Sequence, residues 1–166
     1  MNDPTPGAWR AVRFVPFEEV DYHAWLTRAI PAFALAKVEE GRWTLAESIA
    51  KSQEVHLQLL PQGLATPGHF FARLQATDTG EDVGVLWWAE SDNAGRREAY
   101  VYALEIEEAA RRRGHARTAL RELERMARER GVQQLALHVF GHNHGARRLY
   151  DELGFEPTSI TLRKNL

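Results

Sequence analysis

The strongest constraint on the fold lies in residues 100–140, where a strand pattern, a glycine-bearing basic loop, a helix pattern and a second strand pattern follow one another. Residues 100–106 place aromatic and aliphatic side chains at every second position, which indicates a β-strand. Residues 116–127 repeat apolar side chains at the i, i+3, i+4 and i+7 spacing of one helix face. Gly131 suits a left-handed helix end, and residues 134–140 again read as a strand. This order predicts a βαβ unit whose two strands are parallel and adjacent.

The loop at residues 111–116 reads Arg-Arg-Arg-Gly-His-Ala, and its position before a helix gives it a chemical role. The first N–H groups of a helix have no intrahelical partner, and the macrodipole adds partial positive charge there. A glycine lets the backbone approach a ligand closely, and the arginines add full charges. The loop therefore predicts a phosphate or pyrophosphate site. Neither G-x-G-x-x-G nor G-x-x-x-x-G-K-[ST] occurs, which disfavours a Rossmann enzyme and a P-loop NTPase.

Two motifs share the last third of the chain. Arg111, Gly114 and Ala116 fit R-x-x-G-x-A, and residues 143–155 fit N-x-x-A-x-x-L-Y-x-x-L-G-F. They occur in this order and are separated by one predicted helix and one predicted strand. With this spacing the sequence resembles the GCN5-related N-acetyltransferase (GNAT) superfamily.

The resemblance implies an α/β (α+β) fold, with a mixed, mostly antiparallel sheet, a parallel βαβ unit and helices on both faces. Residues 1–166 would form a single N-acetyltransferase domain. The implied activity is direct transfer of an acetyl group from acetyl-CoA to a primary amine, on a small molecule, a peptide N-terminus or a lysine. The first two thirds of the chain would wall the acceptor site.

The resemblance also implies which residues bind CoA. The pantetheine arm would contact the backbone of the strand before the loop, the pyrophosphate would contact the loop, and the second motif would supply further contacts. These residues are Leu104, Ile106, Arg111, Arg112, Arg113, Gly114, His115, Ala116, Arg117, Asn143 and Tyr150. His115 would contribute its backbone N–H, and Asn143 would also cap its helix.

Acetyl transfer from a thioester to an amine requires a neutral amine, a stabilised oxyanion and a proton for the departing thiolate. By the resemblance Tyr150 is the candidate general acid, although its helical spacing also fits a core tyrosine. His138 is the candidate general base, because its strand neighbours take the core face and an imidazole has an ordinary pKa of about 6.5. A structural strand histidine is an equally good interpretation. Glu105 and Tyr102 are alternative bases.

Composition limits the other functions. The 166 residues are 44% hydrophobic and 27% charged, the formal net charge is −2, and cysteine is absent. No apolar run reaches membrane-spanning length and the N-terminus is not a signal peptide, so we expect a cytoplasmic protein that binds neither membrane nor nucleic acid. No carboxylate pair or cysteine motif accompanies His138, His142 and His144, so we expect no metal site.

The remaining pattern predicts the order β-α-α-β-β-β-α-β-α-β. Trp87 and Trp88 should point to opposite faces of their strand. Pro31 should kink or divide the first helix, and Thr44 with Glu47 should form a capping box. The expected segments are strands at 9–15, 69–76, 83–89 and 158–163, helices at 17–40 and from 44 toward 60, and a polar loop at 91–97.

Two other functions stay open at this point. One is a non-catalytic acyl-CoA-binding or regulatory domain that has kept the loop without turnover. The other is nucleic-acid binding through residues 111–117, which the net charge and the lack of a second basic stripe disfavour. A homodimer is also left open, because exposed sheet edges in this architecture often pair.

Overall fold

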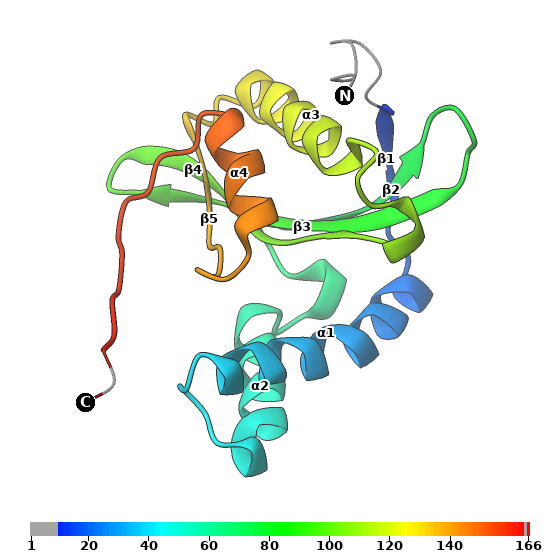
Figure 1. Cartoon of the computed structure of the whole chain (residues 1–166). Helices are drawn as coiled ribbons and strands as arrows, with labels where there is room; N and C mark the ends of the chain where they lie inside the picture. The colour runs from blue at the N-terminus through cyan, green and yellow to red at the C-terminus, as the bar shows by residue number, and fades with distance from the viewer. Residues whose placement is uncertain (1–9, 165) are drawn as a thin grey trace.

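The computed structural model describes residues 10–164 and residue 166, and the start of the first predicted strand at Trp9 lies outside these residues. Five strands form one sheet in the order β1-β2-β3-β4-β5, and β5 alone runs parallel to its neighbour (Figure 1). The strands are β1 (Val12–Pro16), β2 (His69–Ala76), β3 (Asp82–Asn93), β4 (Arg96–Ile106) and β5 (Gln134–Leu137).

Helices cover both faces of the sheet. Helices α3 and α4 lie on one face, and α1 and α2 lie on the other (Figure 1). The elements are α1 (Glu19–Glu39), α2 (Leu45–Leu59), α3 (His115–Glu129) and α4 (His144–Glu152), with short 3-10 turns η1 (Gly63–Ala65) and η2 (Glu108–Ala110). The predicted fold class and the parallel βαβ unit formed by β4, α3 and β5 are therefore confirmed.

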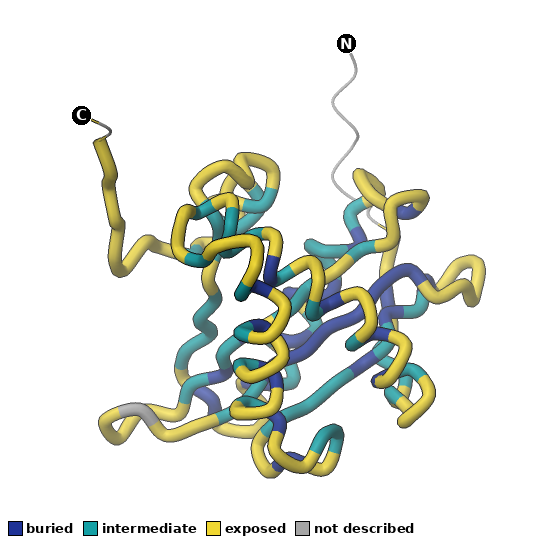
Figure 2. The backbone as a smooth tube through the Cα atoms, turned by 90° about the horizontal axis from the view of Figure 1, so that it is seen from below, coloured by how far each residue is buried: buried dark blue, intermediate teal, exposed yellow. Residues whose placement is uncertain are grey.

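Each face of the sheet has its own apolar core, and the central strands are buried between the two (Figure 2). On the α3 side, the stripe of Leu120 and Leu123 packs against the sheet. On the α1 side, Trp25 is buried against the sheet. Trp87 belongs to the α1-side core and Trp88 to the α3-side core, as strand alternation predicts.

Strand β5 pairs with only part of β4. The parallel ladder joins residues 98–101 of β4 to β5 and ends at the pair of Val101 with Leu137. Strand β4 continues to Ile106 and keeps its pairing with β3 over that length. Trp87 of β3 pairs with Ala103, and the next residue, Trp88, pairs with Val101. Tyr102 is therefore an extra residue of β4 and forms a β-bulge. The last five residues of β4 thus have one edge that β5 does not cover.

The local signals at chain breaks are confirmed. Gly131 has φ +77°, and the Thr44 N–H donates to Glu47 Oε1 at 3.0 Å in the predicted capping box. Pro31, however, does not divide the first helix, and α1 continues through it. A proline removes one backbone hydrogen bond, whereas Trp25 and Ala34, on either side of it in the chain, are both buried and hold the helix to its neighbours.

Three expected segments are wrong. Residues 91–97 are not a loop, because β3 and β4 continue to a tight turn at Ala94 and Gly95, both with positive φ. Strand β5 ends at Leu137 rather than at residue 140. Residues 158–163 form no strand, since alternation makes a chain strand-like but a strand also needs a ladder partner. Instead this segment runs exposed from α4, and Arg163 donates to the Glu40 carbonyl (red in Figure 1).

Candidate active site

The uncovered edge of β4 presents backbone groups from two predicted site residues. The Glu107 N–H donates to Val83 O at 2.9 Å, so the odd-numbered residues here direct their backbone toward β3. Leu104 and Ile106 consequently direct theirs to the opposite edge. The Ile106 carbonyl accepts from Arg111 Nε at 3.0 Å, which agrees with this orientation. The edge can therefore pair with an extended ligand as a further strand would.

The loop from Arg111 to Gly114 brings the start of α3 to this edge. Gly114 is the N-cap of α3, has φ +88° and provides no side-chain cap. Within the described part of the chain, the amides of Gly114, His115 and Ala116 donate to no other group. Amides without a partner at a helix start are donors of the kind that can bind an anion. Arg112 also has a positive φ of +61°, which is strained for a residue with a side chain.

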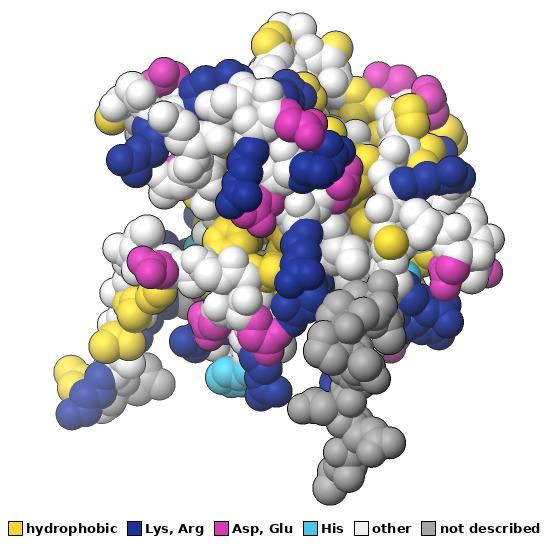
Figure 3. Space-filling view, turned by 90° about the horizontal axis from the view of Figure 1, so that it is seen from above, with side chains coloured by type: hydrophobic (Ala, Val, Ile, Leu, Met, Phe, Trp, Pro, Cys, Tyr) yellow, Lys and Arg dark blue, Asp and Glu magenta, His cyan; other side chains and the backbone are white. Residues whose placement is uncertain are grey.

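The arginines of the loop occupy different surroundings. Arg111 is tied to the β4 edge, and Arg112 and Arg113 are exposed. Arg117 forms an ion pair with Glu152 and so joins the start of α3 to the end of α4. Over the face above the sheet, Lys and Arg side chains are interspersed with Asp and Glu (Figure 3). Residues 111–113 place three exposed cationic side chains next to the start of α3.

His115 is in the loop, but its side chain faces inward. The residue is 2% exposed, and its Nδ1 has no hydrogen-bond partner among the described residues. Its backbone N–H lies at the start of α3, and whether this group contacts CoA stays a prediction.

Helix α4 supplies the second motif. Asn143 Oδ1 accepts from the Ala146 N–H at 3.1 Å, which confirms its predicted role as the N-cap. The Tyr150 ring lies 5.6 Å from the Phe155 ring and packs against the α3-side core. Burial raises the pKa of the Tyr150 phenol, so this group is protonated at neutral pH and can donate a proton.

His138 lies directly after the end of β5 and is exposed. Its ring meets Phe140 edge-on at 5.2 Å, and Phe140 lies under the Lys37 ammonium of α1 at 5.4 Å. The segment after β5 therefore approaches the C-terminal end of α1. Leu137 packs on the α3-side core, whereas the contacts of the His138 segment are with α1, so the predicted orientation of His138 away from that core agrees with the structure.

On the α1-facing side of the sheet, two hydrogen bonds involve side chains that the sequence analysis did not place in the site. Trp25 Nε1 donates to Glu105 Oε1 at 3.1 Å, so α1 orients a carboxylate of β4. Trp87 Nε1 donates to His69 Nδ1 at 3.0 Å. Burial lowers the pKa of His69, which keeps the imidazole neutral and able to accept this bond. Trp25 and His69 were not predicted as site residues, because no motif or spacing connects them to β4.

The described residues contain no group of three or more His, Cys, Asp or Glu side chains placed to hold a metal ion. The His142 ring stacks on Phe140 at 5.6 Å. None of the described helices is long and apolar enough to cross a membrane.

In this mixed sheet the parallel strands β4 and β5 separate after Val101 and Leu137, next to helix α3, which has a glycine as its N-cap. This arrangement is that of an N-acetyltransferase fold. The chain belongs to the acetyltransferase (GNAT) family, whose sequence model matches residues 32–155. The assignment of this enzyme class from the two motifs is therefore confirmed, and acetyl-CoA is the general acetyl donor of the family.

The comparisons with individual proteins agree. The chain is 34% identical to the uncharacterized N-acetyltransferase YycN of Bacillus subtilis over 155 residues, which cover 93% of this chain and 99% of YycN. The crystal structure of YycN matches with a TM-score of 0.87, over 94% of this chain and 99% of that one. The uncharacterized N-acetyltransferase YdgE of the same organism is 35% identical over 89% of this chain and 94% of its own length.

A third relative is the mycothiol acetyltransferase of Thermobispora bispora, which is 34% identical over 158 residues. The match covers 92% of this chain but 49% of the relative, so the chain spans about half of that protein.

Proposed function

We propose that this chain transfers an acetyl group from acetyl-CoA to a primary amine, and that residues 1–166 act as one catalytic domain. The observation that carries the proposal is the uncovered edge of β4 beside the uncapped start of α3. The residues present fit the donor. Leu104 and Ile106 would pair with its amide-bearing arm, and the amides after Arg113 would bind its pyrophosphate.

When bound, acetyl-CoA supplies an activated acetyl thioester. The N–H groups at the β4 edge are donors that need no reorganisation, and such donors stabilise developing negative charge on an oxygen. Tyr150 donates a proton to the departing sulfur, for which its protonated state at neutral pH is required. Asn143 completes the donor site from the start of α4.

Two side chains are candidates for the general base that takes the proton of the acceptor amine. His138 is the first, as an exposed imidazole next to the end of β5. Glu105 is the second, as a carboxylate of β4 that Trp25 holds in place. The two groups are distinguishable, because an imidazole and a carboxylate titrate about two pH units apart in their ordinary ranges.

The test is a screen of amines with acetyl-CoA that measures release of the free CoA thiol. Small-molecule amines lead the screen because the relatives include mycothiol acetyltransferases, and lysine peptides and free peptide N-termini follow. Amine-dependent thiol release with formation of the N-acetylated product supports the proposal. Tight binding of acetyl-CoA with no acceptor in any class would instead favour the non-catalytic acyl-CoA-binding domain.

A further inference from the structure

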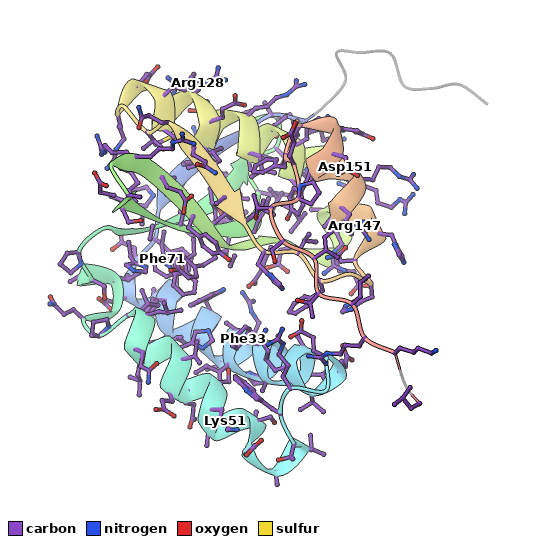
Figure 4. All side chains as sticks on the ribbon, turned by 90° about the vertical axis from the view of Figure 1, so that its left-hand side faces the viewer. Phe33, Lys51, Phe71, Arg128, Arg147 and Asp151 are labelled. Atoms are coloured by element: carbon purple, nitrogen blue, oxygen red, sulfur yellow. The ribbon has the colours of Figure 1, made fainter. Side chains whose placement is uncertain are left out.

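A series of stacked aromatic rings crosses the α1-facing side of the sheet and ends at the candidate active site. The Phe71 ring of β2 stacks on the Trp87 ring of β3 at 5.3 Å and 9°. Trp87 in turn stacks on the Tyr102 ring of β4 at 4.5 Å and 19°. The series begins at Phe17, whose ring stacks on Phe71 at 5.5 Å. Figure 4 shows Phe71 between the sheet and α1.

Tyr102 is the last ring of this series, and it is open on one side. It is the extra residue of the β-bulge and is 38% exposed, whereas Trp87 is 3% exposed. The rings of Trp87 and His69, which contact Tyr102 at 4.5 and 5.6 Å, both come from strands on the β3 side. The Tyr100 ring of β4 lies 4.8 Å from the Tyr102 ring, with an angle of 59° between the two ring planes.

The β5 side of Tyr102 is where the sheet opens. The parallel ladder ends one residue earlier, at Val101 and Leu137. If the ladder continued, His138 would stand opposite Tyr102, but the two strands no longer pair there. A flat ring entering this gap would extend the series by one more ring, in the offset stacking that aromatic pairs prefer.

A negative charge lies along the same strand. Glu105 is three residues beyond Tyr102 and faces α1, as its hydrogen bond from Trp25 shows. The Arg28 guanidinium of α1 pairs with Glu107 at 3.9 Å, and Glu105 forms no ion pair with the described residues. An ammonium group can therefore be attracted to Glu105 while a ring on the same molecule lies on Tyr102.

We infer that the acceptor is an arylalkylamine, with its flat ring stacked on Tyr102 and its ammonium group directed toward Glu105. The inference rests on the proposed transfer to an amine and names the acceptor class for that site. The alkyl spacer between ring and nitrogen would run along β4, from Tyr102 toward Glu105. The flat ring, rather than apolar bulk alone, is the feature that Tyr102 recognises.

The test compares two amines that differ only in ring flatness, 2-phenylethylamine and 2-cyclohexylethylamine. KM for each is measured at saturating acetyl-CoA in the wild type, Tyr102→Phe and Tyr102→Ala. In the wild type, KM should be about tenfold lower for the phenyl compound. Tyr102→Phe should keep this preference because it keeps the ring, and Tyr102→Ala should abolish it. Thermal unfolding of both variants verifies that they are folded.

Equal KM values for the two amines in the wild type, or a preference that survives Tyr102→Ala, would overturn the inference. If other amines are acetylated while the phenyl preference is absent, the transferase proposal stands and this acceptor class is wrong. If no amine is acetylated, calorimetric binding of the two amines in the presence of CoA decides. Tyr102-dependent binding of the phenyl compound then supports the site, and equal or absent binding of both amines refutes it.

Discussion

At the scale of single residues, the fold has set the protonation of several groups near the β4 edge. Burial raises the pKa of Tyr150, and it also raises the pKa of Tyr102, whose ring ends the aromatic series. Burial lowers the pKa of His69, whose Nδ1 accepts a hydrogen bond from Trp87. At neutral pH these groups are uncharged, so Glu105 and the loop arginines carry the charge of the site. Three predictions follow from single side chains.

Tyr150→Phe should lower kcat while leaving the affinity for acetyl-CoA nearly unchanged, because the phenol would act only as the thiolate departs. The loss expected for a general acid is roughly 10²–10⁴-fold. Steady-state kinetics measure kcat, and calorimetry measures the affinity. Tyr22→Phe is the control, since burial also raises the pKa of the Tyr22 phenol and Tyr22 lies in the α1-side core, outside the proposed site. Wild-type kcat in Tyr150→Phe, with chemistry rate-limiting, would leave Tyr150 with a packing role alone.

His138→Ala should remove an ascending limb from the pH profile of kcat/KM. If an imidazole takes the acceptor's proton, the limb lies near pH 6–7, whereas an ordinary carboxylate as the base would place it about two units lower. His138→Glu should restore part of the rate and move the limb downward. His142→Ala is the control, because His142 also contacts Phe140. A limb that persists in His138→Ala but disappears in Glu105→Gln would assign the base to Glu105.

The protein should lose stability as the pH falls below about 6.5, in part through His69. The folded pKa of His69 is lowered, so the unfolded chain binds a proton first and protonation favours unfolding. The loss ends once the pH passes below the folded pKa. His69→Gln, whose amide oxygen can still accept the Trp87 N–H, should show a weaker decrease in Tm between pH 7.5 and 5.5. An identical decrease in both proteins would show that His69 does not contribute.

At the scale of elements, the proposed site draws on three of them: the uncovered end of β4, the start of α3 and helix α4. The loop between β4 and α3 uses two left-handed residues, Arg112 and Gly114, to turn the backbone toward the β4 edge. Glycine adopts such a conformation readily, whereas an arginine there is strained. The ion pair of Arg117 with Glu152 then ties α3 to α4. Binding of CoA should therefore depend on the backbone of this loop.

Gly114→Asp should weaken CoA binding at least tenfold, or about 1.4 kcal/mol. The change puts a side chain on a backbone with φ +88° and a negative charge beside the proposed pyrophosphate position. Isothermal titration with CoA measures the affinity. Gly95→Asp is the matched control, because Gly95 has φ +79° at the distant β3–β4 turn and an added Cβ there meets nothing within 4 Å. Unchanged affinity in folded Gly114→Asp would remove this loop from the CoA site.

At the scale of the whole molecule, the sheet links two cores and the site. Strand β3 lies in the middle of the sheet and contributes Trp87 to one core and Trp88 to the other. Strand β4, which pairs with β3, carries the β-bulge at Tyr102 and the uncovered edge. A change in the spacing of β3 and β4 should therefore affect stability and donor binding together.

Gly84→Ala tests this link. An added Cβ at Gly84 would lie 2.1 Å from the Glu105 carbonyl oxygen, so the backbone of β4 must move. We expect a stability loss of about 1–3 kcal/mol by denaturant unfolding, as for other overpacked interiors, and weaker CoA binding. Gly145→Ala, where nothing lies within 4 Å, is the control for stability and should not lower it by a comparable amount. A destabilised Gly84→Ala protein that binds CoA normally would show that the edge is insensitive to this spacing.

Much of the architecture was predictable because its causes are local. The stripe of α3, the glycine at 131, the capping box at Thr44 and the N-cap at Asn143 depend on residues a few positions apart, and each is confirmed. The two motifs identified the family because their spacing spans one βαβ unit. The errors arose where local pattern and tertiary context disagree. The polar residues at 91–97 continue a hairpin because β3 and β4 keep pairing, and the apolar alternation at 158–163 forms no strand without a partner.

The sequence by itself determined the order of elements from β1 to α4, the glycine-led start of α3 and the identity of the enzyme family, since these follow from side-chain periodicity, backbone preference and motif spacing. The tertiary structure alone decided where β5 leaves β4, because the length of a ladder depends on both strands and on the bulge at Tyr102. It also brought Trp25 to Glu105 across 80 residues of chain and stacked Trp87 on Tyr102. Such contacts join residues far apart in the chain, and no local pattern encodes them.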